Sequence, residues 1–132
     1  MRRFWLSSKP LVAIVCGLMN PIPPVKAGGP QLVIWNTCKH LSDVEFDWKV
    51  LSLWDEAVEN VDFDRERFVQ VRIGKKEEKI SQFAQKMPYR LVKDWFGVVR
   101  EDHLALNLAM VHELKRMKPD VVIVHESYSL CL

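Results

Sequence analysis

His125 and Glu126 are the two residues of this chain whose types and position best suit chemistry. They directly follow Val121–Val124, four β-branched residues in a row, a composition typical of a strand buried on both faces of a parallel sheet. Polar groups at the carboxyl end of such a strand usually face a crevice. There a histidine can act as an acid, a base or a hydrogen-bond donor to a ligand. The pair is therefore the first candidate for a ligand site.

A second interpretation of the same pair is structural. Neighbouring residues on a strand point to opposite faces, so both side chains line one pocket only where the strand has already turned. Otherwise one side chain packs into the next layer and bonds to backbone, while the other is solvated. A third residue assigned to the ligand site is Asn36, in the polar turn Asn36–His40 that follows the first predicted strand.

Other polar residues fit structural roles better than catalytic or metal-binding ones. His103 and His112 lie nine positions apart on one predicted helix, half a turn out of phase, so they cannot bind one metal ion together. An acidic stretch lacks the ligand spacing of a calcium loop and indicates a solvated loop (Glu59, Asp62, Asp64). Gly28–Gly29 precedes the first predicted strand, where a phosphate loop would have to follow it. The sequence therefore predicts neither a metal nor a cofactor, and it leaves open whether the chain is an enzyme.

The elements that position His125 begin with a predicted helix over Glu101–Met117. Its apolar residues recur at spacings of four, four and three, which places them on one stripe (Leu106, Met110, Leu114, Met117). Pro119 cannot continue the helix. A helix, a tight turn and a buried strand form half of a βαβ unit.

The preceding part of the chain contributes three predicted strands and two predicted helices. Leu32–Trp35 is wholly apolar and is expected at the centre of the sheet. Trp48–Trp54 suits a strand covered on both faces, and Phe68–Ile73 alternates apolar and polar residues like an edge strand. The helices cover Glu77–Met87 and Arg90–Val99. This order predicts the α/β class, with a single small, mostly parallel sheet flanked by helices in a Rossmann-like arrangement.

Residues 1–27 have the composition of a secretory signal that precedes this domain. Basic residues come first (Arg2, Arg3, Lys9), then the apolar run Leu11–Met19 and a small-residue cleavage site at Val25–Ala27. We therefore predict a signal peptide over residues 1–27, an α/β domain over residues 28–132 and a secreted or exported protein. Three alternatives stay open: an uncleaved anchor in the membrane, a lipoprotein signal that uses Cys16, and an ordinary buried segment of a cytosolic domain.

Loss of that segment leaves Cys38 and Cys131, which suit a single disulfide in an exported protein. Cys38 follows the first predicted strand, and Cys131 follows the last. In a sheet ordered 3-2-1-4 these two strands are parallel neighbours, so their carboxyl ends lie close enough for the bond. The alternative is a free thiol at Cys131 on a disordered tail.

The distribution of charge argues against nucleic acid as a partner. The formal net charge is +2, but residues 1–27 hold four of the 19 basic residues and none of the 17 acidic ones. The remainder therefore carries a net charge of −2 and lacks the concentrated positive charge of a nucleic-acid surface. Membrane contact is expected only through the N-terminal segment, because no later segment is long and apolar enough to span a bilayer.

The stretch from His112 to Glu126, HELKRMKPDVVIVHE, resembles a segment in the N-terminal Rossmann-like domain of GT-B glycosyltransferases. In that family a helix leads through Lys/Arg-Pro-Asp into a strand that ends in His. The resemblance implies that His125 and Glu126 border the cleft in which acceptor and sugar donor meet. It also implies a sugar or nucleotide-sugar as the ligand.

Two features depart from the family pattern. Its members often carry a glycine-rich turn after the first strand, where this chain has Asn36–Cys38, and a second domain that holds the nucleotide-sugar, which this sequence lacks. The resemblance then implies the N-terminal, acceptor-side half of a GT-B-like glycosyltransferase that is not catalytically complete alone. The alternative is a small exported, non-catalytic α/β module that binds a protein or a small ligand.

Overall fold

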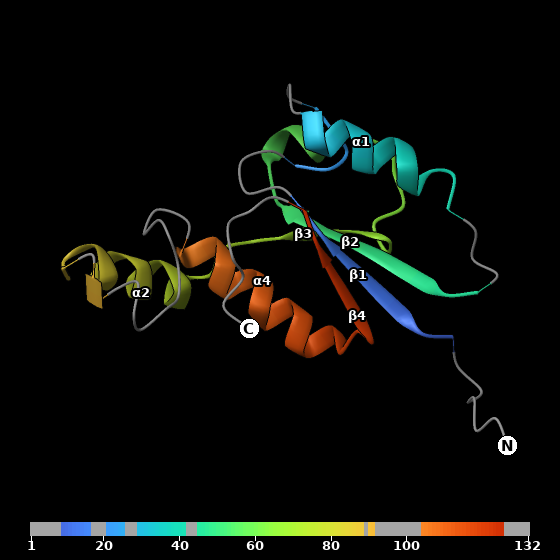
Figure 1. Ribbon diagram of the computed structural model, residues 1–132. Coiled ribbons are helices and arrows are strands. Elements are labelled where there is room, and N and C mark those ends of the chain that lie inside the picture. Colours follow the sequence, from blue (N-terminus) through green and yellow to red (C-terminus); the bar gives the residue numbers. More distant parts are fainter. Residues whose placement is uncertain are drawn as a thin grey trace, which may run out of the picture.

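The computed structural model describes residues 9–16, 21–25, 29–41, 45–88, 90–91 and 104–125. In this part of the chain four strands form one sheet, and all of its pairs are parallel (Figure 1). The strands are β1 (Leu11–Val15), β2 (Asp47–Leu53), β3 (Phe68–Val71) and β4 (Val121–Val124), in the spatial order β3-β2-β1-β4. The helices are α1 (Gly29–Cys38), α2 (Lys75–Gln85) and α4 (Leu104–Met117), with the short 3₁₀ helix η1 (Glu56–Val58). The predicted α/β class with a small parallel, Rossmann-like sheet is confirmed.

Helices lie on both faces of the sheet. α1 crosses one face, and α4 lies on the opposite face with α2 packed against it (Figure 1). Alternate side chains of each strand point into the two cores, because neighbouring residues of a strand face opposite sides of the sheet. The core under α4 is aliphatic (Ala13, Val15, Leu51, Val71, Leu106, Ala109, Met110, Leu114). The core under α1 mixes aliphatic, aromatic and cysteine side chains (Ile14, Cys16, Ile22, Ile34, Cys38, Trp48, Val50, Phe68).

The central strand, β1, lies ahead of the domain boundary expected at Gly28. It pairs with β2 on one side and β4 on the other, and Ala13, Ile14 and Val15 are buried. The apolar run with the composition of a signal therefore forms a strand of the sheet in this structure, and the signal peptide stays a prediction. A chain that begins at Gly28 would lack this strand, and intact-mass analysis of exported protein tests whether that cleavage occurs. Among the described residues no helix is long and apolar enough to cross a membrane.

The sequence predicts a strand at Leu32–Trp35, but the structure has a helix there. The inward-facing residues of α1 recur at spacings of three and four (Gln31, Ile34, Cys38). Leu32 and Val33 face outward, 51% and 63% exposed. The prediction was wrong because four consecutive apolar residues hide the helical period, and such a run does not distinguish a buried strand from a helix.

The helix and strand before His125 form as predicted, but β4 is an edge strand. After α4, Asp120 ties the turn to the start of β1. Its carboxylate accepts a hydrogen bond from the N–H of Leu11 at 2.7 Å, and its own N–H donates to the carbonyl of Leu11 at 2.9 Å. The predicted burial of both faces is wrong, because β4 lies at the edge of the sheet and its aliphatic residues are 43–49% exposed (Val121, Ile123, Val124).

Three of the remaining elements agree with the sequence. β2 and α2 form where they are predicted, and β3 is the expected edge strand. The helix predicted at Arg90–Val99 lies almost wholly outside the described residues.

Candidate functional site

The carboxyl ends of β1 and β4 meet where the order of the strands reverses. From β1 the chain passes to β2 and β3 on one side, and it returns through α4 to β4 on the other side of β1. In open α/β sheets such a reversal leaves a crevice beyond the carboxyl ends, and ligands bind there. This carboxyl end of β1 and β4, which we call the switch edge, is the candidate site.

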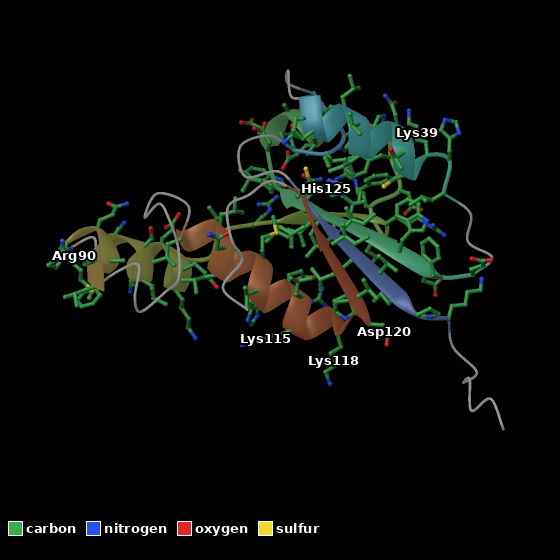
Figure 2. The ribbon with its side chains drawn as sticks, viewed as in Figure 1. Lys39, Arg90, Lys115, Lys118, Asp120 and His125 are labelled. Atoms are coloured by element: carbon green, nitrogen blue, oxygen red, sulfur yellow. The ribbon has the colours of Figure 1, made fainter. Side chains whose placement is uncertain are left out.

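His125 lies at the switch edge, one residue beyond β4 (Figure 2). Its backbone N–H donates to the carbonyl of Val15, the last residue of β1, at 2.9 Å, so the ladder fixes its backbone. The residue is exposed. An exposed imidazole can bind a ligand as donor or acceptor without first breaking a buried hydrogen bond. Glu126, its predicted companion, lies outside the described residues.

The structure does not bring Asn36 to the same place. Asn36 lies on the exposed side of α1, in the second half of the helix. That helix runs from the switch edge back toward the amino ends of the strands (Figure 1). The interpretation of Leu32–Trp35 as a strand put Asn36 at a carboxyl end, and the helix removes this reason for assigning it to the ligand site.

A glycine does follow the first strand. The sequence suggests that Gly28–Gly29 precedes that strand, but Gly29 begins α1, which comes after β1. A Cβ on Gly29 would meet no atom of the described residues within 4 Å. No acidic residue lies in the first turn, and the positive end of the helix dipole favours negative groups, although Pro30 supplies no N–H there.

Cys38 is a buried free thiol at the end of α1. Burial raises the pKa of this thiol above its ordinary value. The predicted disulfide needs Cys38 at the carboxyl end of a strand, whereas the end of α1 lies toward the amino ends of the strands (Figure 1). Cys131 lies outside the described residues. Among the described residues Cys38 forms no disulfide, and the geometric reason for the predicted pairing is lost.

The carboxyl half of the sheet holds a buried polar cluster that the sequence did not reveal. It joins Ser52 of β2, Gln70 of β3 and Ile22 of the connection between β1 and α1. Ile22 is 0% exposed and Ser52 is 1% exposed. A serine among the inward-facing residues of β2 is the one signal in the sequence, because Gln70 has the position of a solvated residue on an edge strand.

A cavity of about 540 Å³ opens beside β3, two strands away from the switch edge. Two of the residues that line it are arginines, and both already have partners in the fold. The guanidinium of Arg72 lies 4.0 Å from the ring centroid of Trp54 and 3.5 Å from a carboxylate oxygen of Glu59. Arg65 donates through Nη2 to three backbone carbonyls, the nearest at 3.0 Å. The two arginines of this cavity are therefore already engaged within the fold.

The remaining candidate residues of the sequence have structural surroundings. Oδ1 of Asp64 accepts hydrogen bonds from the N–H groups of Glu66 at 3.0 Å and Arg67 at 3.3 Å, which orders the acidic loop. His112 is exposed on α4, and His103 lies outside the described residues. Within the described ranges no group of three or more His, Cys, Asp or Glu side chains is placed to hold a metal ion.

Comparison of this chain with protein-family models, with curated proteins and with solved structures finds no match. The argument for a function therefore rests on the switch edge itself. That edge carries His125 and the start of α1, and both features bear on ligand binding.

Proposed function

We propose that this chain is the acceptor-side half of a GT-B-like glycosyltransferase and that it binds a sugar or a nucleotide-sugar at the switch edge. The observation that carries the proposal is the position of His125, one residue beyond β4 and bonded through its backbone to the end of β1. Ligands of open α/β sheets bind at such a reversal of strand order. The start of α1 at Gly29 supports the proposal, because the positive end of a helix dipole suits a phosphate, although Pro30 in the first turn has no N–H to donate.

In this proposal His125 and Glu126 are binding residues. A neutral imidazole has one donor and one acceptor, which matches a sugar hydroxyl, and a carboxylate accepts from two hydroxyls. Sugar transfer would need a second domain to hold the nucleotide-sugar against this edge. The chain alone is therefore expected to bind and not to catalyse.

Isothermal titration of the chain with UDP-glucose, UDP-N-acetylglucosamine and GDP-mannose tests the proposal. We expect one of these ligands to bind, and we expect His125→Ala to raise its Kd about tenfold, a loss of about 1.4 kcal/mol. Because His125 is exposed, the thermal midpoint should stay within about 2 °C of that of the unsubstituted chain.

His40→Ala is the matched control for that titration. His40 is also exposed, but it lies just past the end of α1, at the far end of the helix from the switch edge. Its substitution should leave the Kd unchanged. The proposal fails if none of the three ligands binds, or if the two substitutions weaken binding equally.

A non-catalytic interaction module is the second candidate, and the exposed aliphatic residues of β4 favour it. Val121, Ile123 and Val124 are at least 43% exposed, and an apolar edge strand is prone to pair with another chain. This candidate predicts no sugar binding and an association with protein that Ile123→Lys abolishes. Sedimentation velocity of the chain, with and without that substitution, measures the association.

A further inference from the structure

The connection that leaves β1 is held at one deeply buried residue, Ile22. Its side chain is 0% exposed and belongs to the core under α1 with Ile14 and Val50. The prolines on either side of it are buried as well. A segment at this depth must satisfy its peptide groups inside the protein, because water does not reach them.

The side chains of Ser52 and Gln70 satisfy the peptide groups of Ile22. Oγ of Ser52 accepts from the N–H of Ile22 at 3.1 Å and from Nε2 of Gln70 at 3.1 Å, and it donates to the carbonyl of Ile22 at 3.4 Å. Nε2 of Gln70 makes its second hydrogen bond to the same carbonyl. A serine hydroxyl has one donor and two acceptor sites, and an amide NH₂ group has two donors, so all of them are used.

The orientation of the Gln70 amide follows from these contacts. The carbonyl of Ile22 can only accept, so the Gln70 atom that faces it must be the NH₂ group. The other end of the amide, Oε1, is buried without a partner among the described residues. A glutamate at this position would be nearly isosteric, but its ionised side chain has no donor for the carbonyl of Ile22.

We propose that Ser52 and Gln70 are positioning residues of the switch edge: they fix the β1–α1 connection at Ile22 and so set the shape in which it meets a bound sugar or nucleotide-sugar. The part of this inference that concerns the ligand rests on the proposed function. Neither residue is expected to touch the ligand. Both act through the backbone of Ile22.

The anchor matters because of its place between two elements of the switch edge. Ile22 lies in the chain between the end of β1 and the start of α1. Its backbone is held by hydrogen bonds before any ligand arrives, so less conformational entropy is lost at this position on binding, and this favours binding.

Amide hydrogen exchange at Ile22, followed by NMR, measures the anchor directly. In the unsubstituted chain this N–H should exchange slowly, because it is buried and bonded to Ser52. In Ser52→Ala we expect its exchange to accelerate about tenfold, equivalent to about 1.4 kcal/mol. The N–H of Val50, which bonds to the carbonyl of Arg67 in the sheet, should keep its rate and shows that β2 is intact. Gln70→Glu should act in the same direction, and it replaces Ser52→Ala if that variant does not fold.

Titration with the nucleotide-sugar that binds the unsubstituted chain measures the consequence for the ligand. Ser52→Ala and Gln70→Glu should each raise the Kd about tenfold. Ser81→Ala is the control, because it removes a serine hydroxyl that is also buried but lies on α2, on the opposite side of the sheet. If the variants weakened binding only because they destabilise the fold, Ser81→Ala would raise the Kd as well. The positioning role predicts a higher Kd only for the variants at Ser52 and Gln70.

The outcomes separate this inference from the proposed function. Unchanged exchange at Ile22 in both variants would overturn the anchor. A chain that binds a nucleotide-sugar equally well in all variants would overturn the positioning role and leave the proposed function standing. If the unsubstituted chain binds none of the ligands, the proposed function and the ligand part of this inference both fail. The exchange rates then still test whether Ser52 and Gln70 hold Ile22 in place.

Discussion

The two faces of the sheet use different side chains, although they share the same strands. The face under α4 is packed by aliphatic residues such as Leu51. The face under α1 gathers aromatic rings around Phe68 and also holds the hydrogen bonds of Ser52 to Ile22. Leu51 and Ser52 are consecutive and point to opposite faces, so one strand serves both purposes. Among the described residues, the α4 face contributes packing, whereas the α1 face also fixes the connection that leads to the switch edge.

Phe68→Ala should give the largest effect in a test of this comparison. The ring centroid of Phe68 lies 4.7 Å from that of Trp35, 5.6 Å from that of Trp48 and 6.4 Å from that of Phe63. The substitution removes these contacts and leaves a cavity, so the free energy of unfolding should fall by about 4 kcal/mol in urea denaturation. Leu51→Ala on the aliphatic face should cost about 3 kcal/mol. A smaller cost for Phe68→Ala than for Leu51→Ala would contradict the importance given to the aromatic contacts.

A matched pair of Val→Thr substitutions separates the interior of the sheet from its exposed edge. Val50 of β2 is 0% exposed, whereas Val124 of β4 is 43% exposed. Val50→Thr would bury a hydroxyl, and the free energy of unfolding should fall by about 1–3 kcal/mol. Val124→Thr should change it by less than about 0.5 kcal/mol, because the new hydroxyl reaches water. Urea denaturation measures both values, and equal costs would mean that β4 is covered in solution.

The order of the strands could be predicted, although one strand could not. The order 3-2-1-4 is typical of doubly wound α/β sheets. The structure has this order, with β1 as the first strand. Leu11–Val15 and Leu32–Trp35 are both short apolar runs, and local pattern cannot tell a buried strand from a signal or a buried helix. The basic residues ahead of the first run favoured a signal. The helix α1 has no single apolar stripe to reveal it.

The candidate site was predictable where it depends on neighbours in the sequence. His125 follows its strand directly, so its place at a carboxyl end could be inferred from the residues before it. Ile22 and Ser52 lie 30 positions apart, and Ser52 and Gln70 lie 18 apart, so no local pattern pairs them. Gly29 could not be placed after the first strand as long as Leu32–Trp35 was taken for that strand. Contacts of this kind are set by the packing of the sheet and are visible only in the fold.

The smallest predicted effect concerns Cys38, a buried thiol of the α1 face. Burial raises the pKa of Cys38 above its ordinary value of 9.0, so the unfolded chain loses this proton at a lower pH than the folded chain does. Below that pH both states are protonated, and the thiol adds no pH dependence. As the pH rises above it, ionisation favours the unfolded state, and the free energy of unfolding falls.

Urea denaturation at about pH 7 and about pH 10, which bracket the ordinary thiol pKa, checks this sign. The loss of stability between the two should be larger for the unsubstituted chain than for Cys38→Ala, which has no thiol to ionise at that position. Cys16, the other described cysteine of this face, is also buried and is present in both proteins, so its contribution cancels from the difference. An equal loss would mean that the thiol of Cys38 ionises as readily in the folded chain as in the unfolded one. The end of α1 would then be open to water, and the α1 face would be less tightly closed than the α4 face.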